Sequence, residues 1–255
     1  MIIKEFDMGT AHVEVFDSRN AMGEKAGKDI GALFRTLLKK NNELNVMFAA
    51  APSQNEVLSQ LLREQEIDWT KINAFHMDEY IGIAPDNPAG FAQFLKAAIF
   101  GRLPFKSVNY IDCTAADPYA EANRYAELLK NNPLDVCILG VGENGHIAFN
   151  DPDVADFCDP VLAKVIDLDE TSRQQQVNDG CFHSIGDVPH KAITVTIPGL
   201  TKAKYLFCSV PGTTKAKAIS RMFNGSISLE CPATILRQTE NSRVYLDKES
   251  ARGLL

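Results

Sequence analysis

The feature that most constrains this chain is a regular alternation between short apolar runs and longer amphipathic stretches. The apolar runs are rich in β-branched or aromatic residues and are bounded by turn-forming residues, which is typical of buried strands. The predicted strands are Leu44–Ala50, Ile72–Met77, Leu134–Gly140, Lys191–Ile197 and Lys204–Val210. The predicted helices are Ser18–Lys40, Asn55–Glu64, Pro88–Phe100, Pro118–Lys130 and Thr213–Phe223. This order predicts a single α/β domain over residues 1–255, with a mostly parallel sheet flanked by helices.

Polar segments follow four of the predicted strands. In a parallel sheet with right-handed crossovers, the strand-to-helix loops meet at one edge, and ligands bind there outside the carboxyl ends of the strands. The four segments are Ala50–Glu56, His76–Gly82, Gly140–Pro152 and Val210–Ile219. We therefore expect them to converge on one cleft.

Composition excludes several classes of function. The 255 residues are 45% hydrophobic and 23% charged with a net charge of -7, and no long Lys/Arg run suggests a nucleic-acid surface. No apolar run reaches the ~18 residues of a membrane span, and the first residues do not resemble a signal peptide. The six cysteines are scattered without a CxxC pair, which favours reduced thiols. We expect a cytoplasmic protein.

The segment "GVGENGHIAFNDP" suggests acid–base chemistry. Gly142 and Gly145 allow close approach of another group or a positive φ. His146 is the type of side chain that exchanges a proton near physiological pH, and Asp151 is placed to orient its imidazole. A hydrogen-bonded core histidine is the alternative interpretation. The glycine spacing also matches the dinucleotide-binding GxGxxG pattern, but the match is weak because the residues that follow are a poor helix start.

The segment "FHMDEYIG" places two adjacent carboxylates, Asp78 and Glu79, at the end of a predicted strand. One interpretation is a helix-capping acid with a salt-bridged neighbour. The other is a general base whose pKa is raised by partial burial. His76 and the two acids could also bind a metal, but no second His/Cys cluster supports such a site, so we predict none.

Two segments favour a phosphorylated ligand. "PGTTKAKAI" presents backbone N–H groups, hydroxyls and Lys215 at a helix start, and "PSQ" presents Ser53 and Gln54 at another. Either segment alone could be an ordinary helix cap. Because both should reach the same cleft, together they indicate a small phosphate ester.

"LGVGENGHIAFNDP" and "FHMDEYIG" together resemble the signature segments of the glucosamine-6-phosphate deaminase (isomerase) family, which is related to the 6-phosphogluconolactonases. The resemblance covers essentially the whole chain. It implies the parallel α/β fold shared with ribose-5-phosphate isomerase. It also implies conversion of glucosamine 6-phosphate and water to fructose 6-phosphate and ammonia, or the galactosamine analogue, with no metal or organic cofactor.

The resemblance assigns roles by motif position. Asp78 matches the base that moves a proton between C2 and C1, His146 matches the residue that opens the sugar ring, and Lys215 matches a phosphate-binding lysine. Asp151 stands where the family usually has glutamate. Asn144 stands where it usually has aspartate; its amide oxygen can accept a hydrogen bond from the imidazole but carries no charge.

Other departures concern the phosphate and leave the function open. Ala50–Ser53 replaces a Thr-Gly-Gly-Thr loop, and our candidate for the family's phosphate-binding arginine is Arg173. The exact amino sugar therefore stays open. The alternatives are a 6-phosphogluconolactonase-like hydrolase and a non-catalytic sugar-phosphate sensor. The sequence does not decide whether the chain forms a homo-oligomer.

Overall fold

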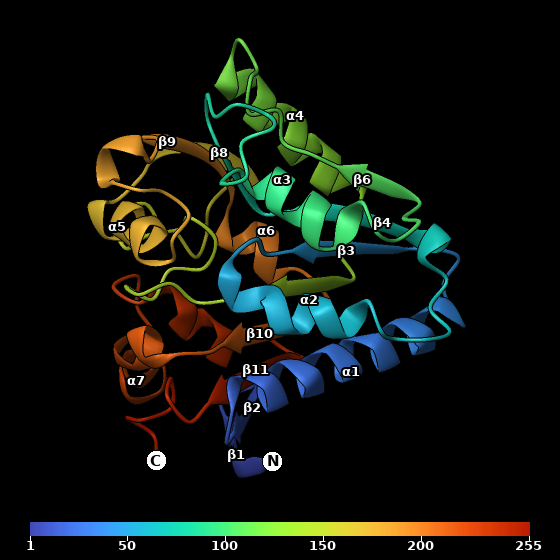
Figure 1. Cartoon of the computed structure of the whole chain (residues 1–255), viewed down its shortest axis with the longest axis vertical. Helices are drawn as coiled ribbons and strands as arrows, with labels where there is room; N and C mark the ends of the chain where they lie inside the picture. Colours follow the sequence, from blue (N-terminus) through green and yellow to red (C-terminus); the bar gives the residue numbers. More distant parts are fainter.

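The structure, a computed structural model that describes all 255 residues, is built on two β-sheets (Figure 1). The main sheet has eight strands in the order β1-β2-β11-β10-β7-β3-β4-β6, and only the β1–β2 hairpin is antiparallel. Its strands are β1 (Ile2–Met8), β2 (Ala11–Phe16), β3 (Leu44–Phe48), β4 (Ile72–His76), β6 (Ser107–Asn109), β7 (Val136–Leu139), β10 (Tyr205–Val210) and β11 (Ser242–Asp247). The predicted fold class is confirmed.

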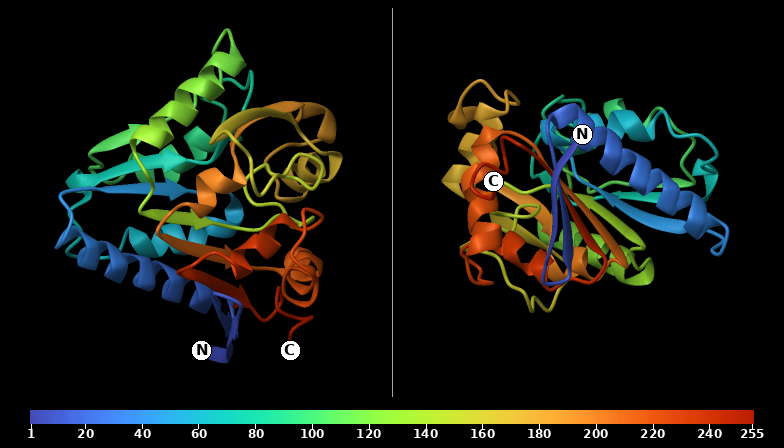
Figure 2. Two further views of the ribbon diagram at one scale, coloured as in Figure 1. Left: turned by 180° about the vertical axis from the view of Figure 1, so that it is seen from behind. Right: turned by 90° about the horizontal axis from the view of Figure 1, so that it is seen from below.

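Helices cover both faces of this sheet (Figure 2). They are α1 (Arg19–Leu38), α2 (Asn55–Leu61), α3 (Phe91–Leu95), α4 (Pro118–Asn131), α5 (Glu170–Asn178), α6 (Ile197–Thr201) and α7 (Ala216–Asn224). The helices α1 and α4 each begin with a side-chain cap: the Ser18 hydroxyl accepts from the Ala21 N–H, and the Asp117 carboxylate accepts from the N–H groups of Tyr119 and Ala120. The expected Pro88–Phe100 helix is shorter, since α3 passes into a π-helical turn at Lys96–Phe100.

Alternate residues of the central strands enter two separate cores. Val46 and Phe48 of β3 pack with α1, α2 and α3, whereas Met47 packs with α4, α6 and α7 on the opposite face. A strand buried on both faces has no polar face, which explains why these segments appear in the sequence as continuous apolar runs.

The segment Lys191–Ile197 departs from the expected order. Its strand, β9 (Lys191–Val195), lies outside the main sheet, in a three-stranded antiparallel sheet with β5 (Asp78–Tyr80) and β8 (Ala163–Asp167). Because β9 is as buried as a central parallel strand, its apolar pattern does not reveal which sheet it joins.

The order of the strands defines a switch point between β3 and β7. From β3 the chain moves outward through β4 and β6, and from β7 it moves in the other direction through β10 and β11. Loops on either side of such a point diverge and leave a crevice at the carboxyl ends of the strands. The loops after β3 and β7 hold Ser53 and His146, two of the predicted site residues.

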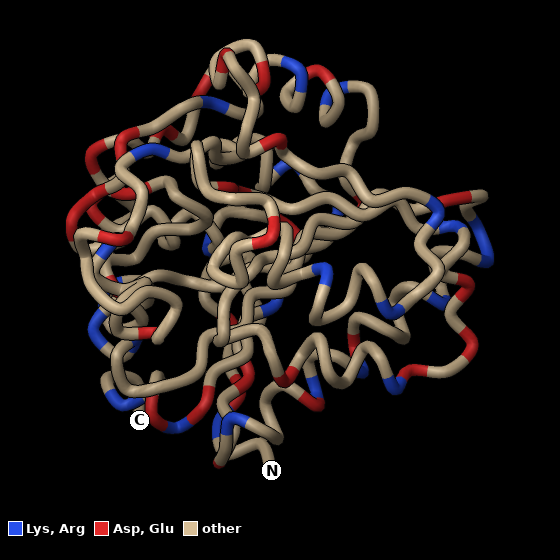
Figure 3. Tube along the Cα trace, turned by 45° about the horizontal axis from the view of Figure 1, so that its top comes forward, with Lys and Arg blue, Asp and Glu red and all other residues tan.

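Acidic and basic residues are interspersed along the chain (Figure 3). None of the helices combines the length and apolar composition that crossing a membrane requires.

Candidate active site

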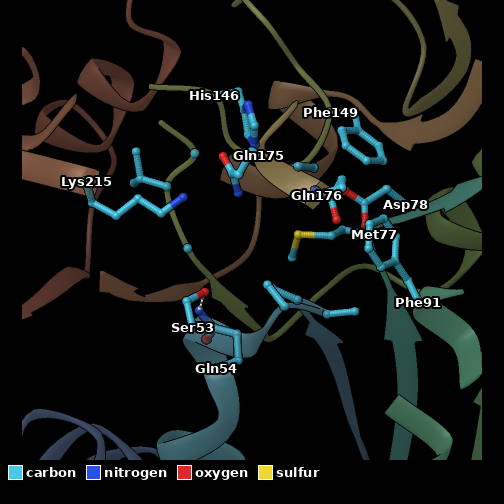
Figure 4. A pocket seen from close by; sticks show the side chains of 17 residues that line it. Ser53, Gln54, Met77, Asp78, Phe91, His146, Phe149, Gln175, Gln176 and Lys215 are labelled. Carbon is cyan, nitrogen blue, oxygen red and sulfur yellow. Dashed lines mark hydrogen bonds between the residues drawn. The ribbon is translucent and has the colours of Figure 1, made fainter. Parts of the chain in front are cut away.

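A cleft opens at the switch point, and the 17 residues that line it include members of all four segments that were expected to converge (Figure 4). The β3 loop contributes Ser53 and Gln54, and the β4–β5 segment contributes Asp78. The β7 loop contributes His146, and the turn after β10 contributes Lys215. Lys215 and Asp78 lie on opposite sides of the cleft, with His146 between them (Figure 4). A ligand can therefore touch a cation at one end and a carboxylate at the other.

The chain passes from one sheet to the other next to Asp78. β4 ends at His76, the Met77 carbonyl accepts from the Val195 N–H at 2.7 Å, and β5 starts at Asp78 in the second sheet. The Asp78 side chain, 7% exposed, lines the cleft. Burial, reinforced by the charges of Glu79 and Asp151, raises the pKa of its carboxyl well above the ordinary value. The result is an unusually basic carboxylate.

Glu79 points elsewhere and is structural. Its carboxylate accepts hydrogen bonds from the backbone N–H groups of Tyr80, Phe91 and Ala92, and so caps the start of α3. His76 is also structural, because its Nε2 accepts from the Ile111 N–H at 2.9 Å inside the core. The capping interpretation therefore applies to Glu79, and the general-base interpretation stays a prediction for Asp78.

His146 is held by a group of polar side chains. Its Nδ1 lies 2.8 Å from Asp151 Oδ1 and 2.9 Å from the hydroxyl of Ser172. Asn144 donates its amide to Asp151 Oδ1 at 2.9 Å and accepts from the backbone N–H of His146 at 3.0 Å. Asn144 makes no hydrogen bond to the imidazole ring: its oxygen accepts from the backbone and its amide donates to Asp151. Asp151, despite its short side chain, reaches the ring.

The pKa of Asp151 is lowered to about 2. Burial alone would raise it, but the charge of His146 and hydrogen bonds from His146, Asn144 and Ser172 outweigh that effect. Asp151 is thus a permanent carboxylate that can only accept hydrogen bonds, and it favours the imidazole form with a proton on Nδ1.

Gly142 and Gly145 of this loop could not be replaced by other residues without strain, for two different physical reasons. A Cβ on Gly142 would lie 2.2 Å from the His146 ring, so the ring rests directly on the backbone there. Gly145 has φ +95°, a conformation that side chains disfavour. The loop is fastened by Asn150, whose amide donates to the carbonyls of Ile147 and Val195.

Lys215 forms the basic end of the cleft. Its side chain is 4% exposed and makes no salt bridge, and burial lowers the pKa of its amine. Gly212, with φ +95°, donates its N–H to the Asp247 carboxylate and so fixes the turn that precedes Lys215. An unpaired, largely buried ammonium indicates an anionic ligand.

Gln54 belongs to the same end. Its amide donates to the Ser209 carbonyl at 3.2 Å, and its buried Oε1 has no partner within the protein. Ser53 lies next to it, with its hydroxyl 3.3 Å from the Gln54 amide nitrogen. Both side chains line the cleft, as the "PSQ" segment suggested.

Arg173 does not line the cleft. Its guanidinium donates to the carbonyls of Ile185 and Val188 and fastens the following loop to α5. No arginine is among the lining residues. Our phosphate-binding candidate is therefore placed away from the site, because it lies on the outer side of α5.

The sequence interpretation missed the opposite side of α5, which supplies Ser172, Gln175 and Gln176 to the site. Their i, i+3 and i+4 spacing puts them on one face of the helix. The available signal was Asp169, whose carboxylate accepts from the N–H groups of Thr171 and Ser172 as a helix cap.

Comparison with known proteins places the chain. A family model described as glucosamine-6-phosphate isomerases/6-phosphogluconolactonase matches residues 17–245. The chain belongs to this family. The resemblance carried by the two signature segments is thereby confirmed.

Curated relatives of the glucosamine-6-phosphate isomerase/6-phosphogluconolactonase family are similar over most of the chain. A protein of Lactococcus lactis named glucosamine-6-phosphate deaminase is 34% identical over 228 residues, covering 88% of this chain and 94% of its own. A protein of the same name from an Exiguobacterium species is 31% identical, covering 91% of each chain.

Solved structures of the family share the fold. A monomeric glucosamine-6-phosphate deaminase superposes with a TM-score of 0.86 at 26% identity, covering 94% of this chain and 99% of that one. The 6-phosphogluconolactonase of Thermotoga maritima superposes with a TM-score of 0.76 at 18% identity, covering 93% and 99%. The second likeness concerns the fold alone.

Proposed function

We propose that this chain isomerises and deaminates an amino-sugar 6-phosphate, converting glucosamine 6-phosphate and water to fructose 6-phosphate and ammonia, or acting on the galactosamine analogue. The observation that carries the proposal is the buried, strongly basic Asp78 in the same cleft as the anchored His146. The names of the relatives that are at least 31% identical support it.

Lys215 would hold the phosphate. The phosphate of such a sugar is on C6, whereas the reacting carbons C1 and C2 are at the other end of the molecule. With the phosphate on Lys215, helped by Ser53 and Gln54, the reacting carbons extend toward Asp78 on the opposite side of the cleft (Figure 4). Binding at one end therefore positions the chemistry at the other.

His146 would open the sugar ring. With its proton on Nδ1, the free Nε2 can accept the proton of the O1 hydroxyl and then deliver that same proton to the ring oxygen O5. The C1–O5 bond breaks, and C1 becomes an aldehyde. The carboxylate of Asp151 stabilises the imidazolium that forms between the two transfers.

Asp78 would then move a proton between carbons. Its carboxylate removes the C2 proton while O1 takes a proton from water, which gives an enolamine. The carboxylic acid then returns its proton to C1, which leaves a protonated imine at C2. Water adds to C2 with release of one proton, which replaces the proton drawn from water, and ammonia departs with the proton of the new hydroxyl to leave the ketone. Because a base acts best when its pKa lies near the working pH, the raised pKa of Asp78 suits this role.

A lactonase is the second candidate, because the fold is also close to that of 6-phosphogluconolactonases. Hydrolysis of a sugar-acid lactone would use His146 to activate water and Lys215 to bind the phosphate. It would not need Asp78 as a carbon base, so the loss of Asp78 separates the two reactions.

The remaining features of the proposal concern where and with what the protein works. We propose a cytoplasmic enzyme whose partner is a small phosphorylated sugar and not a nucleic acid. The six unpaired cysteines, two of them buried in β7 and β10, support a reducing compartment. Acidic residues are interspersed with basic ones along the chain and the net charge is -7, which supports a partner other than a nucleic acid (Figure 3).

The test is ammonia release from glucosamine 6-phosphate and galactosamine 6-phosphate, with proton exchange at C2 followed in heavy water. Asp78→Asn should lower both rates by about 10²–10⁴-fold, the usual contribution of a general base. Asp86→Asn, which changes an exposed aspartate in the loop after β5, is the matched control and should leave both unchanged.

Other results would redirect the assignment. Hydrolysis of 6-phosphogluconolactone that survives Asp78→Asn, without ammonia release, would make the chain a lactonase. Binding of the sugar phosphates with neither C2 exchange nor ammonia would make it a sensor, and either result would overturn the proposal.

A further inference from the structure

Ser172 contacts both partners of the acid–base pair, although nothing in the proposed reaction uses it. It lies in the first turn of α5, is 1% exposed and does not line the cleft. Its hydroxyl is 2.9 Å from His146 Nδ1 and 2.5 Å from Asp151 Oδ1. The hydroxyl, the imidazole nitrogen and the carboxylate oxygen thus form a closed triangle.

Counting donors fixes the direction of these bonds. Asp151 is ionised and can only accept, so the short contact requires the Ser172 hydroxyl to donate to it. The hydroxyl hydrogen is then used, and only an oxygen lone pair faces His146 Nδ1. A lone pair on Nδ1 would be repelled by both neighbours, whereas an N–H there is shared between two acceptors.

The second carboxylate oxygen of Asp151 shows why the carboxylate needs donors that fix its orientation. Asp151 Oδ2 is buried and has no hydrogen-bond partner, so Oδ1 makes all the contacts. Without a donor above it, the carboxylate could turn and exchange its two oxygens. Asn144 holds Oδ1 from the loop itself, and Ser172 holds it from α5.

We infer that Ser172 is a positioning residue that holds His146 in the tautomer with its proton on Nδ1, with the ring fixed so that Nε2 faces the cleft. Only the expected effect of Ser172 on the reaction rate rests on the proposed function; its effect on the tautomer does not. The helix α5 would then both orient His146, through Ser172, and line the cleft, through Gln175 and Gln176.

Two readouts test the inference in the full-length protein. In Ser172→Ala we expect kcat to fall about tenfold to a hundredfold, the value of one hydrogen bond to a charged group, with KM unchanged because Ser172 does not touch the cleft. The second readout is the ¹⁵N spectrum of the histidine rings at about pH 8, assigned with a His146→Gln variant. The wild type should show one His146 tautomer, protonated on Nδ1, and Ser172→Ala should show a mixture.

Matched variants complete the experiment. Ser172→Thr, which keeps the hydroxyl, should restore both the rate and the single tautomer, and Thr171→Ala, at an exposed neighbour on the same helix, should change neither. If Ser172→Ala does not fold, Ser172→Cys, of similar size but a weak donor, is measured in its place with the same expectation.

A single Nδ1–H tautomer in a folded variant without the hydroxyl would overturn the inference, whatever its rate. If the wild type released no ammonia from either sugar, the proposed function would fail, while the ring spectrum would still decide the role of Ser172.

Discussion

The two segments that face each other across the cleft make their reactive groups in opposite ways. On the β4–β5 side, Asp78 has no hydrogen-bond partner within the protein, and burial, reinforced by the charges of Glu79 and Asp151, raises the pKa of its carboxyl. On the β7 side, His146 is held by Asp151, Ser172 and the backbone contact with Asn144. A proton-abstracting base gains strength from isolation, whereas a group that must pass a proton between two oxygens gains from fixed orientation.

The same comparison distinguishes the two buried histidines of the signature segments. His76 is completely buried and has only the Ile111 N–H as a partner for its ring nitrogens, so burial lowers its pKa to about 4. His146 is almost as buried but has a carboxylate beside it and the cleft in front of it. Burial by itself therefore does not separate the two histidines; their partners and their access to the cleft do.

The largest effect on this difference between the two sides of the cleft is expected when the carboxylate that supports His146 is removed. Asp151→Asn should lower kcat by about 10²–10⁴-fold, because the amide cannot stabilise an imidazolium and can present its own N–H to the ring. Ammonia release measures the effect. Asp153→Asn, an exposed aspartate two residues later, is the control, and equal activity of the two variants would contradict an orienting role for Asp151.

The next prediction uses the lowered pKa of His76. Between the ordinary histidine pKa of ~6.5 and about 4, the unfolded chain binds a proton at this site that the folded chain does not. This residue should therefore lower the free energy of unfolding by about 3 kcal/mol as the pH falls through that window. Urea titrations at several pH values should show a flatter dependence in His76→Gln.

Exposed His183 provides the control for that experiment. His183→Gln should keep the wild-type pH dependence. A His76→Gln curve parallel to the wild-type curve would mean that His76 does not resist protonation in the fold.

Replacing Glu79 should have the opposite effect to replacing its neighbour Asp78: the protein should lose stability but keep most of its reaction rate. Glu79→Ala removes the acceptor of two backbone N–H groups at the start of α3 and of the Tyr80 N–H in β5, and we expect the free energy of unfolding to fall by about 1–3 kcal/mol. Urea denaturation checks this, with exposed Glu240→Ala as the control. A fall in kcat as large as that of Asp78→Asn would erase the distinction between the two acids.

The smallest effect should be a gain in stability from Asp78→Asn. Because burial raises the pKa of Asp78, the folded state holds its proton to higher pH than the unfolded state does. The stability linked to that proton is present below the ordinary pKa and is lost as the pH rises. At neutral pH the variant should melt at a higher temperature than the wild type, and this advantage should shrink as the pH falls toward about 4.

Much of this arrangement could be predicted from the sequence. The continuous apolar runs of β3, β4, β7 and β10 indicated a parallel sheet, and the polar segments after them indicated one cleft. The hydrophobic pattern of the sequence could not assign β9 to its sheet, because a strand buried on both faces has the same apolar sequence in either sheet. It also missed the β1–β2 hairpin, since β1 is mostly exposed and has no continuous apolar run.

The missed part of the site has a similar cause. The helix α5 has polar residues on the face that it turns toward the cleft, so no apolar periodicity marks it. Ser172 and Gln175 look like surface residues until the fold places Asp151 and Glu143 against them. Arg173 was chosen for its charge, yet charge does not specify the side of a helix, and its guanidinium serves two backbone carbonyls.

Gly142 carries a consequence for how such a chain can evolve. Its φ is not in the positive range, and the three atoms nearest to an added Cβ all belong to the His146 ring, so it is the imidazole that excludes a side chain there. A methyl group at that position would displace the ring, while Ser53, Gln54 and Lys215, which come from other loops, would stay in place. We expect a single Gly142→Ala replacement to yield a receptor for the same sugar phosphate that no longer transforms it. A catalyst and a receptor in this fold would then be one mutational step apart.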